Sequence, residues 1–319
     1  MIKKLYQMFI LGTDGGGYEA ALQKGLGGVI FFTHDIQSKN QFKKLVEQIK
    51  STSLIPPFLS VDQEGGRVER TENIHNGKKY LSAKYAYEKG EEFLKDQTKQ
   101  IALELKDYGL NLNFAPCIDV NTNPDNPIIG ERAFSSVAEN VIIAEKIVSD
   151  TYRENGIIPC VKHFPGHGDA DADSHKTLPV IDLSLEEMEK THIKPFKMCA
   201  KTANMVMVAH LHCTCFEKEP IPTSLSKNAI SYLRNTLGFE GVIVSDDMIM
   251  QGVQSFGALE ACERGIRAGL NMFIYRDSSV IPVIEKLAEM AENDEVLAEK
   301  INDSYERVIK LKKLFNVIE

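Results

Sequence analysis

The chain of 319 residues has no surplus of basic residues and no long apolar run. Its 37 Lys and Arg stand against 45 Asp and Glu, and this formal net charge of -8 argues against a partner with a phosphate backbone. No apolar run approaches the roughly 20 residues that a membrane helix requires. We therefore expect neither nucleic acid nor a membrane as a partner.

Signs of export are also scarce. The start, "MIKKLYQMFILG", has the basic residues of a signal peptide, but its apolar run is short and contains Gln7, so we expect a first strand. No cysteine belongs to a CxxC pair, and the pattern indicates buried thiols in a reducing compartment. The six cysteines are Cys117, Cys160, Cys199, Cys213, Cys215 and Cys262. The cytoplasm is the expected location.

The apolar residues, 43% of the chain, gather in short runs separated by longer amphipathic segments. This alternation is typical of parallel strands joined by crossover helices. The eight runs are "LYQMFILG", "GGVIFF", "PFLSVD", "LNLNFAPCIDV", "IIPCVKHF", "NMVMVAHLH", "GVIVSDD" and "NMFIYR". Eight such units predict an α/β fold with a single (β/α)8 barrel of the TIM type.

Helix signals support this interpretation. Ser184 and Glu187 form a capping box, and Ser226 precedes a helical segment that stops at Gly238. Residues 279–315 have the apolar spacing of the closing helix and one more. The sequence shows no linker, so we expect residues 1–319 to form a single domain. No sequence feature reports the oligomeric state, and a monomer is our expectation.

Polar residues end most of these runs, where a barrel of this type builds its active site. They are Asp62, Arg67, Arg70, Asp119, Arg132, Lys162, His163, His210, His212, Asp246, Asp247 and Arg276. Asp119 could instead cap a turn and Asp247 could be a helix N-cap. Because buried charges need partners, so many of them on one rim predict a ligand site.

The stretch "KHFPGHGDADADSH", residues 162–175, has three interpretations. Its alternating His and Asp residues could hold a divalent ion, or it could be a solvated polar turn. It could also be a catalytic loop. Residues two apart in an extended segment point the same way, so Asp173 can orient the imidazole of His175 as an acid and base.

At these residues the sequence resembles glycoside hydrolase family 3, and in particular the bacterial β-N-acetylglucosaminidases of peptidoglycan recycling. The shared motifs follow the family's order over most of the chain. They are "QMFILG", "GGVIFF", "DQEGGRV", "NFAPCIDV", "GERAFS", "KHFPGHGDADADSH", "VAH" and "VIVSDDM". The aromatic "FFTHDI" with His34, and "FIYRD" with Arg276, depart from the pattern, so the roles of these two residues stay open.

The resemblance implies roles for individual residues. Asp246 matches the nucleophile and His175 the acid/base, with Asp173 as its partner. The positions that match contacts to N-acetylglucosamine are Asp62, Arg70, Arg132, Lys162 and His163. We expect His210, at the end of the sixth run, to contact the substrate as well.

The resemblance further implies a retaining β-N-acetylglucosaminidase that removes N-acetylglucosamine from 1,6-anhydro-N-acetylmuramyl-peptides, and we expect it to need no cofactor or metal. Asp246 attacks the anomeric carbon while His175 protonates the leaving oxygen and then activates water. A histidine acid/base does not repel phosphate, so phosphorolysis is the alternative within this class. A metal-dependent barrel hydrolase and a non-catalytic muropeptide-binding module are the rival classes.

Overall fold

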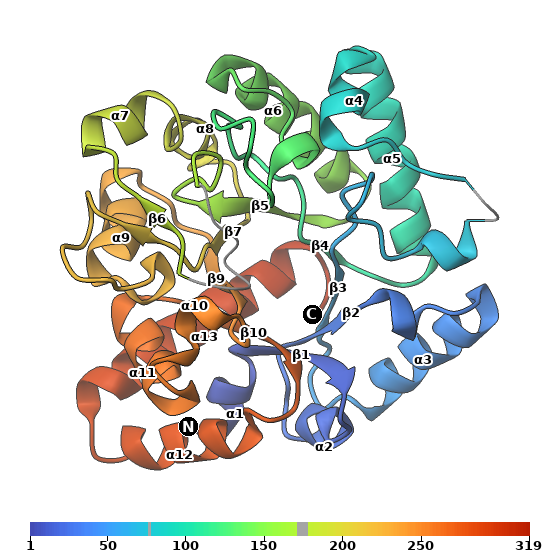
Figure 1. The fold of residues 1–319 in the computed structure, drawn as a ribbon. Helices are drawn as coiled ribbons and strands as arrows, with labels where there is room; N and C mark the ends of the chain where they lie inside the picture. Colours follow the sequence, from blue (N-terminus) through green and yellow to red (C-terminus); the bar gives the residue numbers. More distant parts are fainter. Residues whose placement is uncertain (76–77, 171–177) are drawn as a thin grey trace.

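Eight parallel strands close into a barrel in the computed structural model, which describes residues 1–75, 78–170 and 178–319 (Figure 1). The order around the barrel is β1-β10-β9-β7-β5-β4-β3-β2. The bounds are β1 Phe9–Asp14, β2 Gly28–Phe31, β3 Phe58–Val61, β4 Leu112–Asn113, β5 Ile158–Phe164, β7 Met205–Val208, β9 Val242–Asp247 and β10 Met272–Asp277. The expected TIM-type barrel is confirmed.

Helices surround the strands (Figure 1). Their bounds are α1 Ile2–Tyr6, α2 Tyr18–Gln23, α3 Lys39–Thr52, α4 Ala83–Glu88, α5 Glu91–Asp107, α6 Ala138–Glu154, α7 Leu185–Lys190, α8 Lys194–Cys199, α9 Lys227–Ser231, α10 Gln251–Gln254, α11 Ala258–Ala268, α12 Ile281–Ala291 and α13 Glu295–Leu314. Within the described ranges, none of these helices is both long and apolar enough to cross a membrane. A separate pair of parallel strands, β6 Val180–Ile181 and β8 His212–Cys213, lies outside the barrel sheet.

Two helix starts form as their sequences indicate. Ser184 accepts a hydrogen bond from the Glu187 amide and the Glu187 side chain bonds back, which is the expected capping box of α7. Ser226 caps α9 through the Ala229 amide, at 3.0 Å. The helix expected to run on to Gly238 instead changes after Ser231 to π-helical bonding over Tyr232–Thr236.

The start of the chain corrects one expectation. The apolar run that we assigned to a first strand begins as helix α1, and the strand starts only at Phe9. Leu5 and Tyr6, the last two residues of α1, are fully buried, and α1 packs against α12 and α13. Alternation alone does not separate a short buried helix from a strand, since both bury apolar side chains.

Helix α13 closes the end of the barrel at which the strands begin. Val308 and Leu311 of α13 belong to the same apolar cluster as the inward-facing residues of the strands. Lys312, fully buried, donates hydrogen bonds of 2.8 Å to Gln7 Oε1 and to the carbonyl of Pro56, which precede β1 and β3. With this end filled, the carboxyl ends of the strands are left for a site.

A buried ion-pair cluster fixes the segment that follows β3. The His75 ring, 1% exposed, lies 2.7 Å from Glu69 Oε1 through Nδ1 and 2.6 Å from Glu104 Oε1 of α5 through Nε2. Burial lowers the pKa of His75, but the two glutamates outweigh it and raise the pKa to about 9. The imidazolium therefore ties the segment carrying Arg70 to α5.

Candidate active site

A cavity of about 360 Å³ opens at the carboxyl ends of the barrel strands. Its polar lining residues are Asp62, Arg67, Arg70, Arg132, Lys162, His163, His167, Asp246, Asp247 and Arg276. Six of these, Asp62, Arg70, Arg132, Lys162, His163 and Asp246, are the residues to which the resemblance gives roles in the chemistry or in sugar binding. The fold thus brings together residues that are far apart in the sequence.

Strand alternation explains why several of these side chains enter the cavity. Side chains two apart on a strand share a face, and on β9 Val242 and Val244 fill the barrel interior, so Asp246 is the next inward residue. On β5, Ile158 and Cys160 point inward and Lys162 follows. The same step reaches Asp62 after β3 and Arg276 on β10. The inward rows of these four strands therefore end in charged groups.

Glu64 organises the cations of the cavity wall. Its Oε2 accepts from Arg132 Nε at 2.9 Å, and its Oε1 accepts from Arg132 Nη2 at 2.8 Å. The same Oε1 forms an ion pair with Lys162 Nζ at 2.6 Å. Lys162 Nζ also donates to Asp62 Oδ1 at 2.7 Å. Our sequence reasoning missed Glu64. It follows Asp62 by two residues in "DQEGGR", which was the available signal.

The charges of this network stabilise one another. Burial raises the pKa of Glu64, but Arg132 and Lys162 outweigh it and hold that pKa well below its ordinary range. Burial lowers the pKa of Lys162, whereas Asp62 and Glu64 raise it further than burial lowers it. Glu64, Arg132 and Lys162 are therefore all charged at neutral pH and hold one another in fixed positions.

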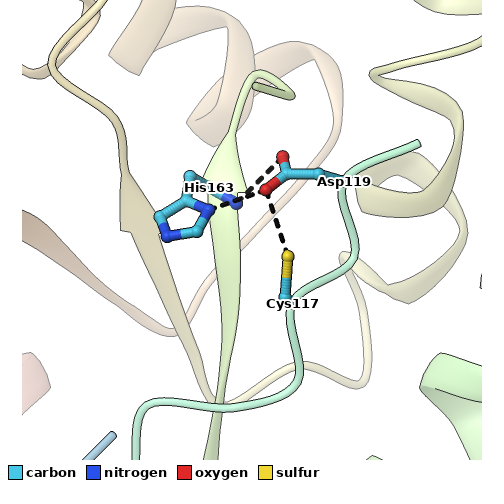
Figure 2. Close-up of side chains that lie close together, drawn as sticks. All are labelled: Cys117, Asp119 and His163. Atoms are coloured by element: carbon cyan, nitrogen blue, oxygen red, sulfur yellow. Dashed lines mark hydrogen bonds and ion pairs between the residues drawn. The ribbon is translucent and has the colours of Figure 1, made fainter. Parts of the chain in front are cut away.

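Asp119 orients His163, as Figure 2 shows. Its Oδ2 accepts from His163 Nδ1 at 2.7 Å, and its Oδ1 accepts from the His163 amide at 3.2 Å. Cys117 Sγ donates to the same Oδ2 at 3.3 Å. With Nδ1 engaged, Nε2 of His163 faces Arg132 Nη2, 3.3 Å away. Asp119 therefore fixes the ring rather than capping a turn.

Cys117, Asp119 and His163 also form the one group that could hold a metal ion among the residues the structure describes. Their hydrogen-bonded geometry fits an ion poorly. The Nδ1 to Oδ2 distance of 2.7 Å is shorter than the spacing of two ligands about 2.1 Å from zinc at a tetrahedral angle. Burial, aided by Asp119, raises the pKa of the Cys117 thiol well above its ordinary value, so the thiolate ligand is costly. These three residues therefore suit a hydrogen-bonded group better than a metal site.

Asp246 is the cavity carboxylate left free of an ion pair among the described residues. Its Oδ1 accepts from the Asp247 amide at 2.8 Å. Burial raises the pKa of Asp246, but the neighbouring His163 and His210 outweigh it, with Lys162 adding to them, and the net pKa is lowered. An ionised oxygen therefore faces the cavity without a cation bound to it.

Asp247 corrects an alternative from the sequence. The next helix, α10, has Met250 at its N-cap, so Asp247 does not cap it. The Asp247 carboxylate instead accepts from Arg276 Nε at 2.8 Å and from the Ile249 amide at 3.2 Å. The ion pair with Asp247 holds Arg276, whose role the sequence left open, in the wall of the cavity.

Three further residues that follow strands, His210, His34 and Arg67, lie outside the cavity or at its rim. His210 is fully buried, with Nδ1 2.7 Å from Ser224 Oγ and Nε2 3.2 Å from the Asp247 carbonyl, and it is not among the lining residues. His34 is exposed and pairs with Asp14 at 2.8 Å. Arg67 lines the rim and donates to the carbonyls of Pro127 and Ile128.

The expected dyad, Asp173 and His175, lies outside the described residues, so its geometry is not part of this structure. Two members of the proposed metal-binding stretch are described. His167 lines the cavity, whereas Asp169 accepts a hydrogen bond from Thr122 at 2.9 Å. In the described part of the chain these two side chains do not form a ligand cluster.

Comparison with known proteins agrees with the geometry. Residues 3–311 match the glycosyl hydrolase family 3 N terminal domain. The chain belongs to glycosyl hydrolase family 3. The match covers nearly the whole barrel, and it includes every cavity-lining residue named above.

Similar proteins in this family carry related names. Beta-hexosaminidase A of Pseudoalteromonas piscicida is 30% identical over 90% of this chain and 53% of its own length. A family 3 beta-N-acetylglucosaminidase from Paenibacillus sp. str. FPU-7 has a TM-score of 0.92 at 29% identity, covering 99% of this chain and 63% of that one. A Beta-N-acetylhexosaminidase from Beutenbergia cavernae has a TM-score of 0.90 at 25% identity, with 98% of both chains covered. The chain thus spans about half to two thirds of the first two relatives.

Proposed function

We propose that this protein is a retaining exo-β-N-acetylglucosaminidase that removes N-acetylglucosamine from the non-reducing end of peptidoglycan fragments. The barrel of residues 1–319 would act as a single catalytic domain and a monomer. Family membership and the names of its relatives support the reaction class. The finer assignment of substrate and residues rests on the cavity.

The observation that carries the proposal is the unpaired state of Asp246. Within the described part of the cavity, Asp62 pairs with Lys162, and Asp247 pairs with Arg276. Asp246 has no such partner, and its pKa is lowered. A carboxylate that is ionised and free to approach carbon is what a nucleophile requires.

In the proposed mechanism, Asp246 attacks the anomeric carbon and the glycosidic bond breaks as His175 gives a proton to the leaving oxygen. His175 then takes a proton from water, which attacks the glycosyl ester and restores Asp246. Asp173 would orient His175. Arg70, Arg132, Lys162 and His163 would hold the sugar hydroxyls, with Asp62. His210, buried behind the wall, would support Asp247 rather than contact sugar.

A cytoplasmic role in peptidoglycan recycling is the proposed setting. The six cysteines are free thiols, five of them buried, as is common in proteins of reducing compartments. The acidic composition and the small cavity fit a carbohydrate substrate rather than a polymer with a phosphate backbone. The muropeptide itself is proposed from the resemblance to the recycling enzymes.

The test is an assay with an aryl N-acetyl-β-glucosaminide and the matching aryl β-glucoside, both in the presence of a chelator. We expect phenol release from the acetamido substrate only. Asp246→Asn should lower kcat by at least about 10³-fold, because the attacking oxygen is lost. Asp247→Asn is the matched control on the next residue of β9, and it should lose far less because the Asp247 carboxylate is already engaged by Arg276 and the Ile249 amide.

Three outcomes would contradict parts of the proposal. Activity restored to the chelated enzyme by a divalent ion would favour the metal-dependent hydrolase. Formation of a sugar 1-phosphate on addition of phosphate would favour the phosphorylase. Binding of N-acetylglucosamine without cleavage of either aryl substrate would favour the muropeptide-binding module.

A further inference from the structure

His167 is a buried imidazole whose ring nitrogens both lack a hydrogen-bond partner among the residues that the structure describes. The residue is 2% exposed and lines the cavity. Burying an unpaired donor and an unpaired acceptor costs free energy, so native proteins rarely leave both without a use. The mechanism described above does not use this residue.

The backbone of His167 is held in place on both sides. Its amide donates to Asp119 Oδ1 at 2.7 Å, and its carbonyl accepts from Asn126 Nδ2 at 2.8 Å. Asp119 therefore positions His167 as well as His163. A fixed backbone keeps the ring at the cavity wall before any ligand arrives.

The two flanking glycines allow this close packing. A Cβ at Gly168 would lie 1.8 Å from the carbonyl oxygen of Val120, and a Cβ at Gly166 would lie 2.7 Å from the His192 Cβ. Gly166 also has a φ of +120°, which residues with side chains rarely adopt. Residues 166–168 therefore pack tightly against Val120 and His192, and it is the His167 side chain that lines the cavity.

The chemistry of the ring indicates the kind of group that it recognises. Burial lowers the pKa of His167 more than Asp119 raises it, so the ring is neutral at pH 7, with one donor and one acceptor nitrogen. Arg132 and Lys162 of the wall, in contrast, are charged. A hydroxyl group both donates and accepts, and it matches a neutral imidazole.

We propose that His167 is a further substrate-contacting residue, whose imidazole hydrogen-bonds a hydroxyl of the sugar held in the cavity. This assignment rests on the proposed function, since it takes a sugar as the ligand. It adds His167 to the residues that the sequence comparison with the family implied.

His192 provides a matched control. It is also a buried histidine, 2% exposed, with its Nδ1 unpartnered among described residues and its pKa lowered by burial. It packs against the same glycine segment but is not among the lining residues of the cavity. His192 is thus a buried histidine beside the same segment that lacks the access to the cavity that His167 has.

The experiment compares His167→Leu with His192→Leu on the aryl N-acetyl-β-glucosaminide and on analogues that each lack one free sugar hydroxyl. We expect kcat/KM of His167→Leu to fall about 10- to 100-fold, and that of His192→Leu to stay within about threefold. On the deoxy analogue that lacks the hydroxyl bound by His167, His167→Leu and the wild type should have the same kcat/KM, because the hydrogen-bond partner of the ring is missing in both cases. Thermal unfolding should show His167→Leu at least as stable as the wild type, because an unpaired buried polar group has been removed.

Equal losses on every analogue, or equal losses in both variants, would overturn the proposal and leave His167 a packing residue. A second readout separates this inference from the proposed function. If the wild type binds N-acetylglucosamine by calorimetry without cleaving the aryl substrate, the proposed reaction fails, while weaker binding by His167→Leu than by His192→Leu still supports the contact. If the wild type neither binds nor cleaves, both proposals fail.

Discussion

Replacing Glu64 by glutamine tests the network that fixes the cavity wall. The substitution keeps the shape of the side chain and removes its charge. Glu64 accepts two hydrogen bonds from Arg132 and forms an ion pair with Lys162. An amide NH₂ at either oxygen position would face one of these N–H donors, so at least one contact becomes repulsive.

The size of the effect follows from burial. The Glu64 side chain is 3% exposed and that of Arg132 is 12% exposed, so the pair is largely withdrawn from water. Removing one partner of a buried ion pair costs about 3 to 5 kcal/mol. Lys162 retains Asp62, which favours the lower end, about 3 kcal/mol. For a chain of 319 residues that corresponds to a Tm lowered by roughly 4 to 5 °C.

Thermal unfolding and kinetics together provide the assay. We expect Glu64→Gln to lower Tm and to raise KM, because Arg132 and Lys162 lose the carboxylate that aims them at the sugar. The pKa of Glu64 is lowered in the fold, so its stabilisation is present above its ordinary value of 4.5 and is lost as pH falls through the lower folded value. The Tm difference should therefore hold at neutral pH and shrink in acid.

Glu145 of α6 is the matched control. It is 5% exposed, its Oε1 has no hydrogen-bond partner among described residues, and burial raises its pKa. Glu145→Gln should therefore be neutral or stabilising and should not change KM. The reasoning is refuted if Glu64→Gln leaves Tm and KM unchanged, or if the two variants lose equal stability.

Three further predictions concern other buried groups. The pKa of His75 is raised to about 9, so its contribution of about 3 kcal/mol is full below pH 6.5 and is lost as pH rises through 9; the Tm difference between wild type and His75→Gln should follow that curve. Burial lowers the pKa of Lys312 to about 7, so the free energy of unfolding of the wild type should rise between pH 7 and pH 10.5. Lys312→Met should abolish this rise. Denaturant titrations at several pH values measure it, and a rise that persists in Lys312→Met would contradict the prediction. Asp119→Asn should lower kcat/KM by about 10- to 100-fold because His163 loses its orienting charge, whereas unchanged steady-state kinetics would remove Asp119 from the site.

The barrel and much of the cavity wall could be predicted from the sequence because both depend on local patterns. Asp62, Lys162 and Asp246 each continue the inward-facing row of a strand, so the strand that positions them also directs them inward. The end of β7 shows the limit of this rule. The inward residue there is Met207, and His210 follows after the strand has ended, where its ring turns towards Ser224.

The pairing of the charges could not be predicted in the same way. Glu64 contacts Arg132, 68 residues away, and Asp119 contacts His163, 44 residues away. Such partners meet only because neighbouring strands bring their carboxyl ends to one rim, at distances that the sequence does not encode locally. From the sequence alone, a turn cap and a residue of the ligand site were equally good interpretations of Asp119, because its partners lie far along the chain.

The pairing pattern separates groups that maintain the wall from groups that remain for the substrate. Among described lining residues, Asp246 has no ion pair, the buried Arg70 Nε has no hydrogen-bond partner, and neither ring nitrogen of His167 has one. Asp246, Arg70 and His167 lie at or beyond the ends of three different strands. Each of these unpaired groups lowers the free energy of unfolding while the cavity holds no sugar. Truncating these three should therefore lower activity at little or no cost in Tm, whereas truncating Glu64 or Asp119 should lower both. A polar group unpaired inside an otherwise satisfied network is best explained by a partner that arrives with the substrate.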